Sequence, residues 1–126
     1  DRYDDTIDLA CLIPDLESFD AGDETLVGEK GMTLSGGQKA RVALARALYE
    51  DADIYLFDDP LSAVDSKVAK LLFEKTIMSY LRQKNKNVIL VTHQIHFLEE
   101  CDQVLIMEDG SIKHFGTPKE LKFQIN

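Results

Sequence analysis

The segment LSGGQKARVALARAL, residues 34–48, places two glycines directly ahead of a nearly all-apolar run. Few polar positions interrupt this run, so we predict a core helix from Gln38 to Glu50 that is largely covered by the rest of the chain. Ser35, followed three residues later by Gln38, has the spacing of a capping box, in which each side chain bonds a backbone N–H of the first turn. The segment therefore predicts a capped core helix.

The glycines of this segment, Gly36 and Gly37, are not needed for capping. Glycine costs about 0.5–1 kcal/mol relative to alanine within a helix. Its missing side chain lets another molecule reach the backbone N–H groups at the positive end of the helix dipole, where phosphate binds readily. Two interpretations are open at this point: a plain helix cap and a phosphate-binding helix N-terminus.

The composition predicts a globular chain that does not bind nucleic acid. Its 126 residues are 44% hydrophobic and 29% charged, which is enough for one domain with a core. The net charge of −9 disfavours binding to nucleic-acid backbones and to anionic membrane surfaces. Cys11 and Cys101 form no CxxC pair, so we expect two core thiols in a reducing compartment.

From its first residues we expect the chain to be a piece of a longer protein. The chain starts at Asp1, and its first methionine is Met32. No apolar run approaches the roughly 18–20 residues of a membrane span, and no signal peptide precedes the first helix.

The pattern along the chain predicts an α/β fold with a strand–helix–strand unit. The unit's strands are short apolar runs typical of buried parallel strands, and Asp109-Gly110 is a strong hairpin turn signal. The predicted elements are, in order, helices at 6–13 and 14–19, a loop at 20–31, the helix at 38–50, a strand at 53–58, a helix at 66–81, a strand at 87–92, a helical turn at 95–101, a hairpin of 103–108 and 111–115, and a last short helix that begins at Thr117 and Pro118.

Three polar residues follow the two predicted parallel strands. Asp58 and Asp59 end the first strand, and His93 ends the second. Ligands of α/β proteins bind at the carboxyl ends of such strands. Adjacent carboxylates there suit phosphoryl transfer, in which one holds Mg²⁺ or its water and the next orients the attacking water.

The motifs together resemble those of ATP-binding-cassette (ABC) ATPases. LSGGQ, IYLFDDP, SAVD and VTHQ are similar, in order and spacing, to the signature, Walker B, D-loop and switch-histidine motifs of that family. The run from VGEKG to SAVD resembles most the first nucleotide-binding domain of the multidrug-resistance-associated subfamily of transporters. The resemblance implies a partial P-loop NTPase-like parallel sheet with flanking helices, a small helical lobe and a C-terminal hairpin. Residues 1–33 would belong to the helical subdomain and the transporter-facing loop, and residues 34–126 to the ATPase core.

The resemblance also implies the role of each motif residue. The signature residues would contact the γ-phosphate of an ATP held by a partner domain: Leu34, Ser35, Gly36, Gly37 and Gln38. Asp58 would serve the Mg²⁺ shell, Asp59 would be the general base, and His93 would contact the γ-phosphate. Ser62 and Asp65, at the ends of SAVD, would communicate across the domain dimer. Glu29, in the segment TLVGEKG, would face the membrane-spanning domains.

The sequence departs from the family pattern in two places. The general base is usually Glu, and Asp59 is one methylene shorter, which reduces its reach toward a water. No G-x-x-x-x-G-K-[ST] occurs in the 126 residues, so the chain has no primary ATP cradle. We therefore expect ATPase activity in the parent transporter, on the cytoplasmic side of its membrane, with ATP and Mg²⁺ as cofactors, and none in the isolated chain. The implied partners are a second nucleotide-binding domain and the membrane-spanning domains.

Four alternative interpretations of these residues exist. A zinc site of His93, His96 and Cys101 lacks a fourth ligand at a usual spacing, so we take His96 as a helix surface residue. A hydrolase triad of Ser62, Asp65 and His93 lacks a nucleophile elbow. A non-transport ABC ATPase of the DNA-repair or translation kind is disfavoured by TLVGEKG, and an interaction module without turnover stays open.

The resemblance implies exposed strand edges, because in the sheet of ABC ATPases the P-loop strand lies between the strand that corresponds to the one ending at His93 and the strand that corresponds to 103–108, and this chain contains no P-loop sequence. Two outcomes would cover these edges: direct pairing of Val88–Val91 with Val104–Met107, or exchange of the hairpin 103–115 with a second copy. We expect association through this edge, and hence a dimer.

Overall fold

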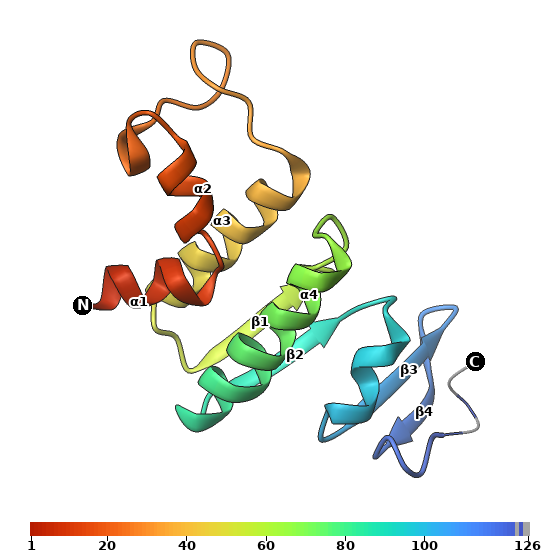
Figure 1. Cartoon of the computed structure of the whole chain (residues 1–126). Coiled ribbons are helices and arrows are strands. Elements are labelled where there is room, and N and C mark those ends of the chain that lie inside the picture. Colours follow the sequence, from red (N-terminus) through yellow and green to blue (C-terminus); the bar gives the residue numbers. More distant parts are fainter. Residues whose placement is uncertain (123, 125–126) are drawn as a thin grey trace. The chain divides into compact units, whose positions relative to one another are not determined.

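The computed structural model describes residues 1–122 and 124, and it divides into two compact units, residues 1–91 and 92–126 (Figure 1). Its elements are α1 (Arg2–Leu9), α2 (Ile13–Ser18), η1 (Gly22–Glu24), α3 (Gly36–Tyr49), β1 (Ile54–Asp58), α4 (Ser66–Leu72), η2 (Phe73–Leu81), β2 (Asn87–Val91), η3 (Ile95–Glu100), β3 (Val104–Glu108) and β4 (Ser111–Gly116). In the described part of the chain, no helix combines the length and apolar character that crossing a bilayer requires.

The first unit contains the predicted strand–helix–strand unit. β1 and β2 pair in parallel, with Ile54 opposite Asn87 and Asp58 opposite Val91. Helices α4 and η2 make the crossover between them. The α/β fold class with a small parallel sheet is confirmed.

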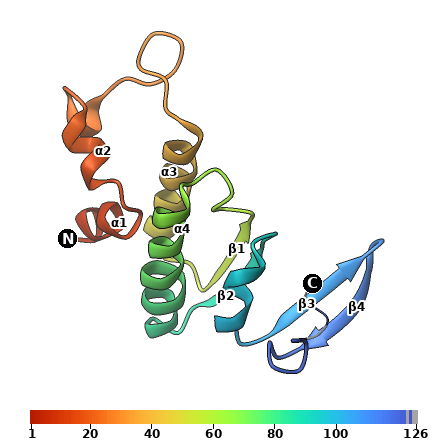
Figure 2. The same ribbon diagram turned by 45° about the vertical axis from the view of Figure 1, so that its right-hand side comes forward.

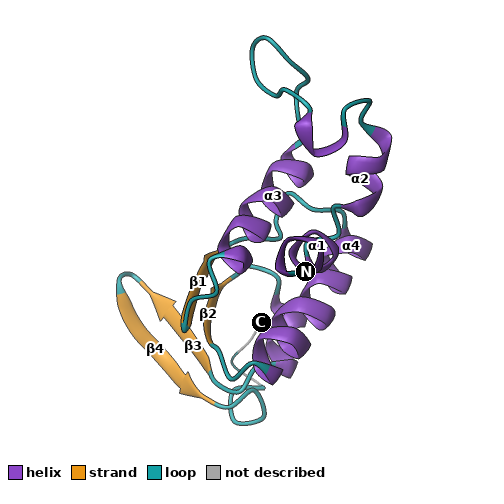
Figure 3. Cartoon of the chain, turned by 90° about the vertical axis from the view of Figure 1, so that its left-hand side faces the viewer, coloured by secondary structure: helices purple, strands orange, loops and turns teal. Residues whose placement is uncertain are grey.

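The prediction that these strands are buried was wrong for one face of the sheet. Tyr55 and Phe57 of β1 are buried with stacked rings, whereas Leu56 is 72% exposed and Ile89 of β2 is 59% exposed. Successive side chains of a strand point to opposite faces. Figure 3 shows α4 on one side of β1 and β2. The exposed Leu56 and Ile89 therefore belong to the face that α4 does not cover.

The predicted helix 66–81 has two geometries. It begins as α4 and continues as η2, a nine-residue π-helix whose i→i+5 hydrogen bonds widen each turn. The Thr76 hydroxyl, fully buried, donates a 2.6 Å hydrogen bond to the carbonyl of Leu9 at the end of α1. Lys75 Nζ lies 3.1 Å from the carboxylate of Asp8. These contacts attach α1 to the crossover. The Leu9 carbonyl is one of the backbone acceptors that the last turn of a helix leaves without a helical partner, and the ion pair of Lys75 with Asp8 adds a second contact beside it.

The second helix forms close to its predicted position, whereas the first lies at Arg2–Leu9 and not at 6–13, because a left-handed residue interrupts the predicted range. Cys11 has φ 56°, which ends the first helical run and starts the turn into α2. Both cysteines are half-buried thiols, and burial raises the pKa of the Cys11 thiol. Ala10 and Leu12 pack on Ala45 of α3, so the predicted core helix is confirmed on this face.

The second unit contains the predicted hairpin. β3 and β4 pair antiparallel, and Asp109 and Gly110 have φ of 50° and 77°, as the tight turn requires. The predicted last helix is a hydrogen-bonded turn within the described residues, in which Thr117 and Glu120 cap each other's backbone N–H. The predicted direct pairing of Val88–Val91 with Val104–Met107 was wrong, because the two strand pairs form separate sheets.

Candidate functional site

The start of α3 has the capping box that the sequence predicts. The Ser35 backbone N–H donates to Gln38 Oε1 at 2.8 Å, and the Gln38 N–H donates to Ser35 Oγ at 3.1 Å. Both bonds satisfy donors at the helix start. Figure 2 shows α3 running from this start to its C-terminal end, after which the chain continues into β1.

A carboxylate from α2 holds the same turn of α3 from the side. Asp15 Oδ1 accepts from Gln38 Nε2 at 3.0 Å and from Arg41 at 3.1 Å, and Asp15 Oδ2 accepts a second bond from Arg41. Arg41 also donates to the Cys11 carbonyl at 2.7 Å. The Arg41 guanidinium, with a smaller contribution from Gln38, holds the pKa of Asp15 below its usual value although burial opposes this. Neither Asp15 nor Arg41 is among the site residues predicted from the sequence. The spacing of Gln38 and Arg41, three residues apart on one helix face, is a local signal for Arg41 alone, and Asp15 has none.

The two glycines of α3 differ in what surrounds them. A Cβ built on Gly37 would lie 3.1 Å from the Ala63 carbonyl oxygen, whereas a Cβ built on Gly36 would lie 3.5 Å from the Ala63 Cβ. Gly37 thus permits close packing of α3 against the loop between β1 and α4, while Gly36 has room for a methyl group.

The start of α3 and this loop enclose a recess of about 350 Å³. Asp65, the N-cap of α4, accepts from the Lys67 N–H at 3.2 Å. The recess brings together four of the predicted site residues, which are Ser35, Gly36, Gly37 and Asp65. It is lined by Ser35, Gly36, Gly37, Arg41, Ala63, Val64, Asp65 and Val68.

A second, larger cavity of about 660 Å³ lies between α1, α2 and α3. Its lining is mainly apolar, and it includes the predicted site residues Leu34 and Gln38. Leu34 therefore lines the apolar cavity and directly precedes the N-cap residue Ser35.

The paired carboxylates lie where β1 ends. Asp58 is exposed, which corrects the expectation of a buried strand end. Asp59 is half-buried in a left-handed conformation with φ 49°, and its N–H donates to the Val91 carbonyl at 2.7 Å. The Ser62 hydroxyl donates to the Asp59 carbonyl at 3.3 Å, so these two residues share the turn that follows Asp58, the last residue of β1.

The carboxylates suit a magnesium ion that takes its other ligands from elsewhere. No cluster of three His, Cys, Asp or Glu side chains able to hold a metal occurs among residues 1–122 and 124. Mg²⁺ is commonly held by one or two carboxylates, with phosphate and water completing its shell. The exposed Asp58 carboxylate fits this pattern.

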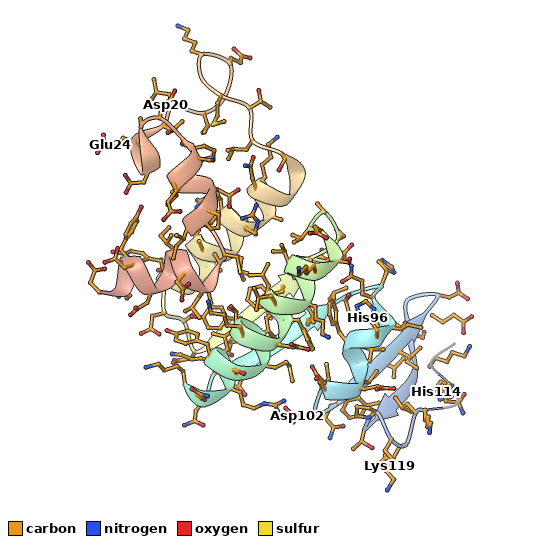
Figure 4. The ribbon with its side chains drawn as sticks, viewed as in Figure 1. Asp20, Glu24, His96, Asp102, His114 and Lys119 are labelled. Atoms are coloured by element: carbon orange, nitrogen blue, oxygen red, sulfur yellow. The ribbon has the colours of Figure 1, made fainter. Side chains whose placement is uncertain are left out.

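His93 and Glu29 are each described within their own surroundings. His93 is exposed and belongs to the second unit, where the neighbouring Gln94 N–H donates to Thr92 Oγ1 at 3.0 Å. Glu29 is exposed in the loop between η1 and α3, beside Val27, which is 55% exposed. His96 is exposed on η3, as predicted (Figure 4).

Comparison with known proteins identifies the family. The family model described as ABC transporter matches residues 10–62. The human ATP-binding cassette sub-family C member 4 is 52% identical over 120 residues, which are 95% of this chain and 9% of that protein. ABC transporter C family member 7 of Arabidopsis thaliana is 50% identical over 119 residues, 94% of this chain and 8% of that protein. The chain belongs to the ABC transporter family.

The match to the ABC transporter family model covers most of the predicted site residues. The matched segment includes the capped start of α3, the paired carboxylates and Ser62. A further ABC relative, probable non-intrinsic ABC protein 5 of Arabidopsis thaliana, is 51% identical over 116 residues, 92% of this chain and 35% of that protein. The chain thus spans less than a tenth of the sub-family C relatives named above and about a third of this one.

Proposed function

We propose that this chain is part of the nucleotide-binding domain of an ABC exporter that binds and hydrolyses ATP to drive transport. Its first task is to present the start of α3 to the γ-phosphate of an ATP held by a second nucleotide-binding domain. The observation that carries this proposal is the capped α3 start, where Gly36 and Gly37 border an open recess. Backbone N–H groups at a helix start bind phosphate, and small residues permit the approach.

The remaining site residues take the roles that their chemistry suits. Asp58 serves the Mg²⁺ shell through its exposed carboxylate, and Asp59 orients the attacking water as general base. His93 contacts the γ-phosphate. Ser62 and Asp65 communicate with the second nucleotide-binding domain across the domain dimer. When bound, Mg²⁺ offsets the charge of the phosphates, which is its usual part in phosphoryl transfer.

The proposed partners follow from this assignment. Glu29 contacts the membrane-spanning domains, which places the chain at the cytoplasmic side of a membrane. Without a G-x-x-x-x-G-K-[ST] sequence, the isolated chain binds MgATP very weakly and does not turn over. Its exposed strand edges favour a dimer of the isolated chain through exchange of the hairpin 103–115.

A second candidate function is that of an ABC protein without attached membrane-spanning segments. The relative named non-intrinsic ABC protein 5 favours this candidate. Membrane-spanning segments in the gene that encodes this chain would decide for the exporter.

The test measures ATP binding by a separate ABC domain that carries a P-loop. Adding the 126-residue chain should raise that domain's affinity for MgATP about tenfold, because charge-assisted hydrogen bonds are worth about 1.5–3 kcal/mol each. Ser35→Arg should abolish the gain, since its side chain fills the recess. Ser79→Arg, the same substitution at an exposed position of η2, is the control and should leave the gain intact. The proposal is wrong if the wild-type chain gives no gain, or if both variants behave alike.

A further inference from the structure

Asp15 is connected to the start of α3 through a chain of hydrogen bonds. Its carboxylate accepts from Gln38 Nε2 at 3.0 Å, and the other end of the same amide, Oε1, accepts from the Ser35 N–H at 2.8 Å. The Gln38 amide therefore has both ends committed. This fixes its orientation, because a rotated amide would put a donor against the Ser35 N–H.

Arg41 makes the same connection rigid. Its guanidinium forms two hydrogen bonds with the Asp15 carboxylate, and each of these two side chains is only 14% exposed. Bidentate guanidinium–carboxylate pairs have a fixed geometry and are stronger than neutral hydrogen bonds. Asp15 is thereby held at one position relative to the first turns of α3, although 23 residues separate it from Gln38.

We propose that Asp15 is a positioning residue for phosphate binding by the α3 start. It acts through Gln38, whose amide it orients so that the capping box of Ser35 stays closed. A displacement of α2 then changes the geometry of the α3 start, so the helical lobe controls the site that faces the neighbouring domain's ATP. This inference rests on the function proposed above.

The first test measures hydrogen exchange of individual amides in the 126-residue chain. Asp15→Asn keeps the shape of the side chain but removes the charge and replaces one carboxylate oxygen by an NH₂ donor, which must then face the donors of Gln38 or Arg41. Exchange at Ser35 and Gln38 should rise about fivefold to tenfold, the effect expected from losing one ordinary hydrogen bond. Exchange at Leu48, near the end of the same helix, should rise only as far as the fall in the free energy of unfolding requires, which is less than at Ser35 and Gln38.

The matched control is Asp8→Asn, which removes another ion-paired aspartate of the same lobe. It should leave exchange at Ser35 and Gln38 unaltered. Equal rises at every α3 amide in Asp15→Asn would mean a general loss of stability and would overturn the proposal, as would no change at Ser35 and Gln38. If Asp15→Asn does not fold, the double variant with Arg41→Met removes the buried charge as well, and the same local rise is expected from it.

The second test separates this inference from the proposed function. The wild-type chain should raise the affinity of the P-loop-bearing domain for MgATP about tenfold. This gain should be lost with Asp15→Asn and stay unchanged with Asp8→Asn. If Ser35→Arg abolishes the gain while Asp15→Asn keeps it, the positioning role is wrong and the proposed function stands. If the wild-type chain gives no gain, the proposed function is wrong, and the role assigned to Asp15 is overturned with it.

Discussion

Alanine substitutions at the two glycines of α3 should have opposite effects on stability. At Gly36 the new Cβ meets the Ala63 Cβ at 3.5 Å, an ordinary van der Waals contact. At Gly37 it meets the Ala63 carbonyl oxygen at 3.1 Å, and the loop between β1 and α4 must move by a few tenths of an ångström. We therefore expect Gly36→Ala to stabilise the chain and Gly37→Ala to destabilise it.

The magnitude follows from two terms. Replacing glycine by alanine in a helix gains about 0.5–1 kcal/mol at either position. Overpacking at Gly37 costs about 1–3 kcal/mol, because backbone rather than a flexible side chain opposes the new methyl group. The free energies of unfolding of the two variants should differ by about 1–3 kcal/mol.

Urea unfolding followed by circular dichroism measures this difference. With a slope of about 1–3 kcal/mol per molar urea, the midpoints of the two variants should differ by about 1 M. Equal midpoints would refute the packing argument. The ATP-affinity assay adds a second comparison: both methyl groups line the recess, so both variants should reduce the affinity gain if the glycines serve phosphate approach.

Three further predictions concern single side chains. Thr76→Val should lower the free energy of unfolding by about 1–3 kcal/mol in urea titrations, because the Leu9 carbonyl loses its buried donor; Thr76→Ser, which keeps the hydroxyl, should lose less. Since Arg41 holds the pKa of Asp15 below the unfolded value of 3.8, the stability from this carboxylate is fully present above that value and is lost as pH falls through the lowered pKa. The unfolding midpoint of Asp15→Asn should therefore lie below that of the wild type at neutral pH and converge with it in acid. In a transporter that carries this chain, Asp59→Glu should raise single-turnover ATP hydrolysis at the site of this domain, and an unchanged rate would mean that another residue positions the water.

The sequence by itself determined the features that depend on short-range rules. One such feature is the capping box of Ser35 and Gln38, and another is the tight turn at Asp109 and Gly110. Each joins residues that are close in the sequence, so its geometry follows from local backbone chemistry. The ordered motifs likewise indicated the ABC family, because their residue types and spacing are contained in the sequence.

Tertiary structure alone decided the features that depend on distant residues. An apolar run such as that of β1 is compatible with one covered face or two, and only the placement of the helices leaves Leu56 exposed. The π-helix of η2 has the same apolar spacing as an α-helix, so its periodicity did not reveal it. The contact of Asp15 with Arg41 spans 26 residues and has no local pattern, because it forms only when α2 packs against α3.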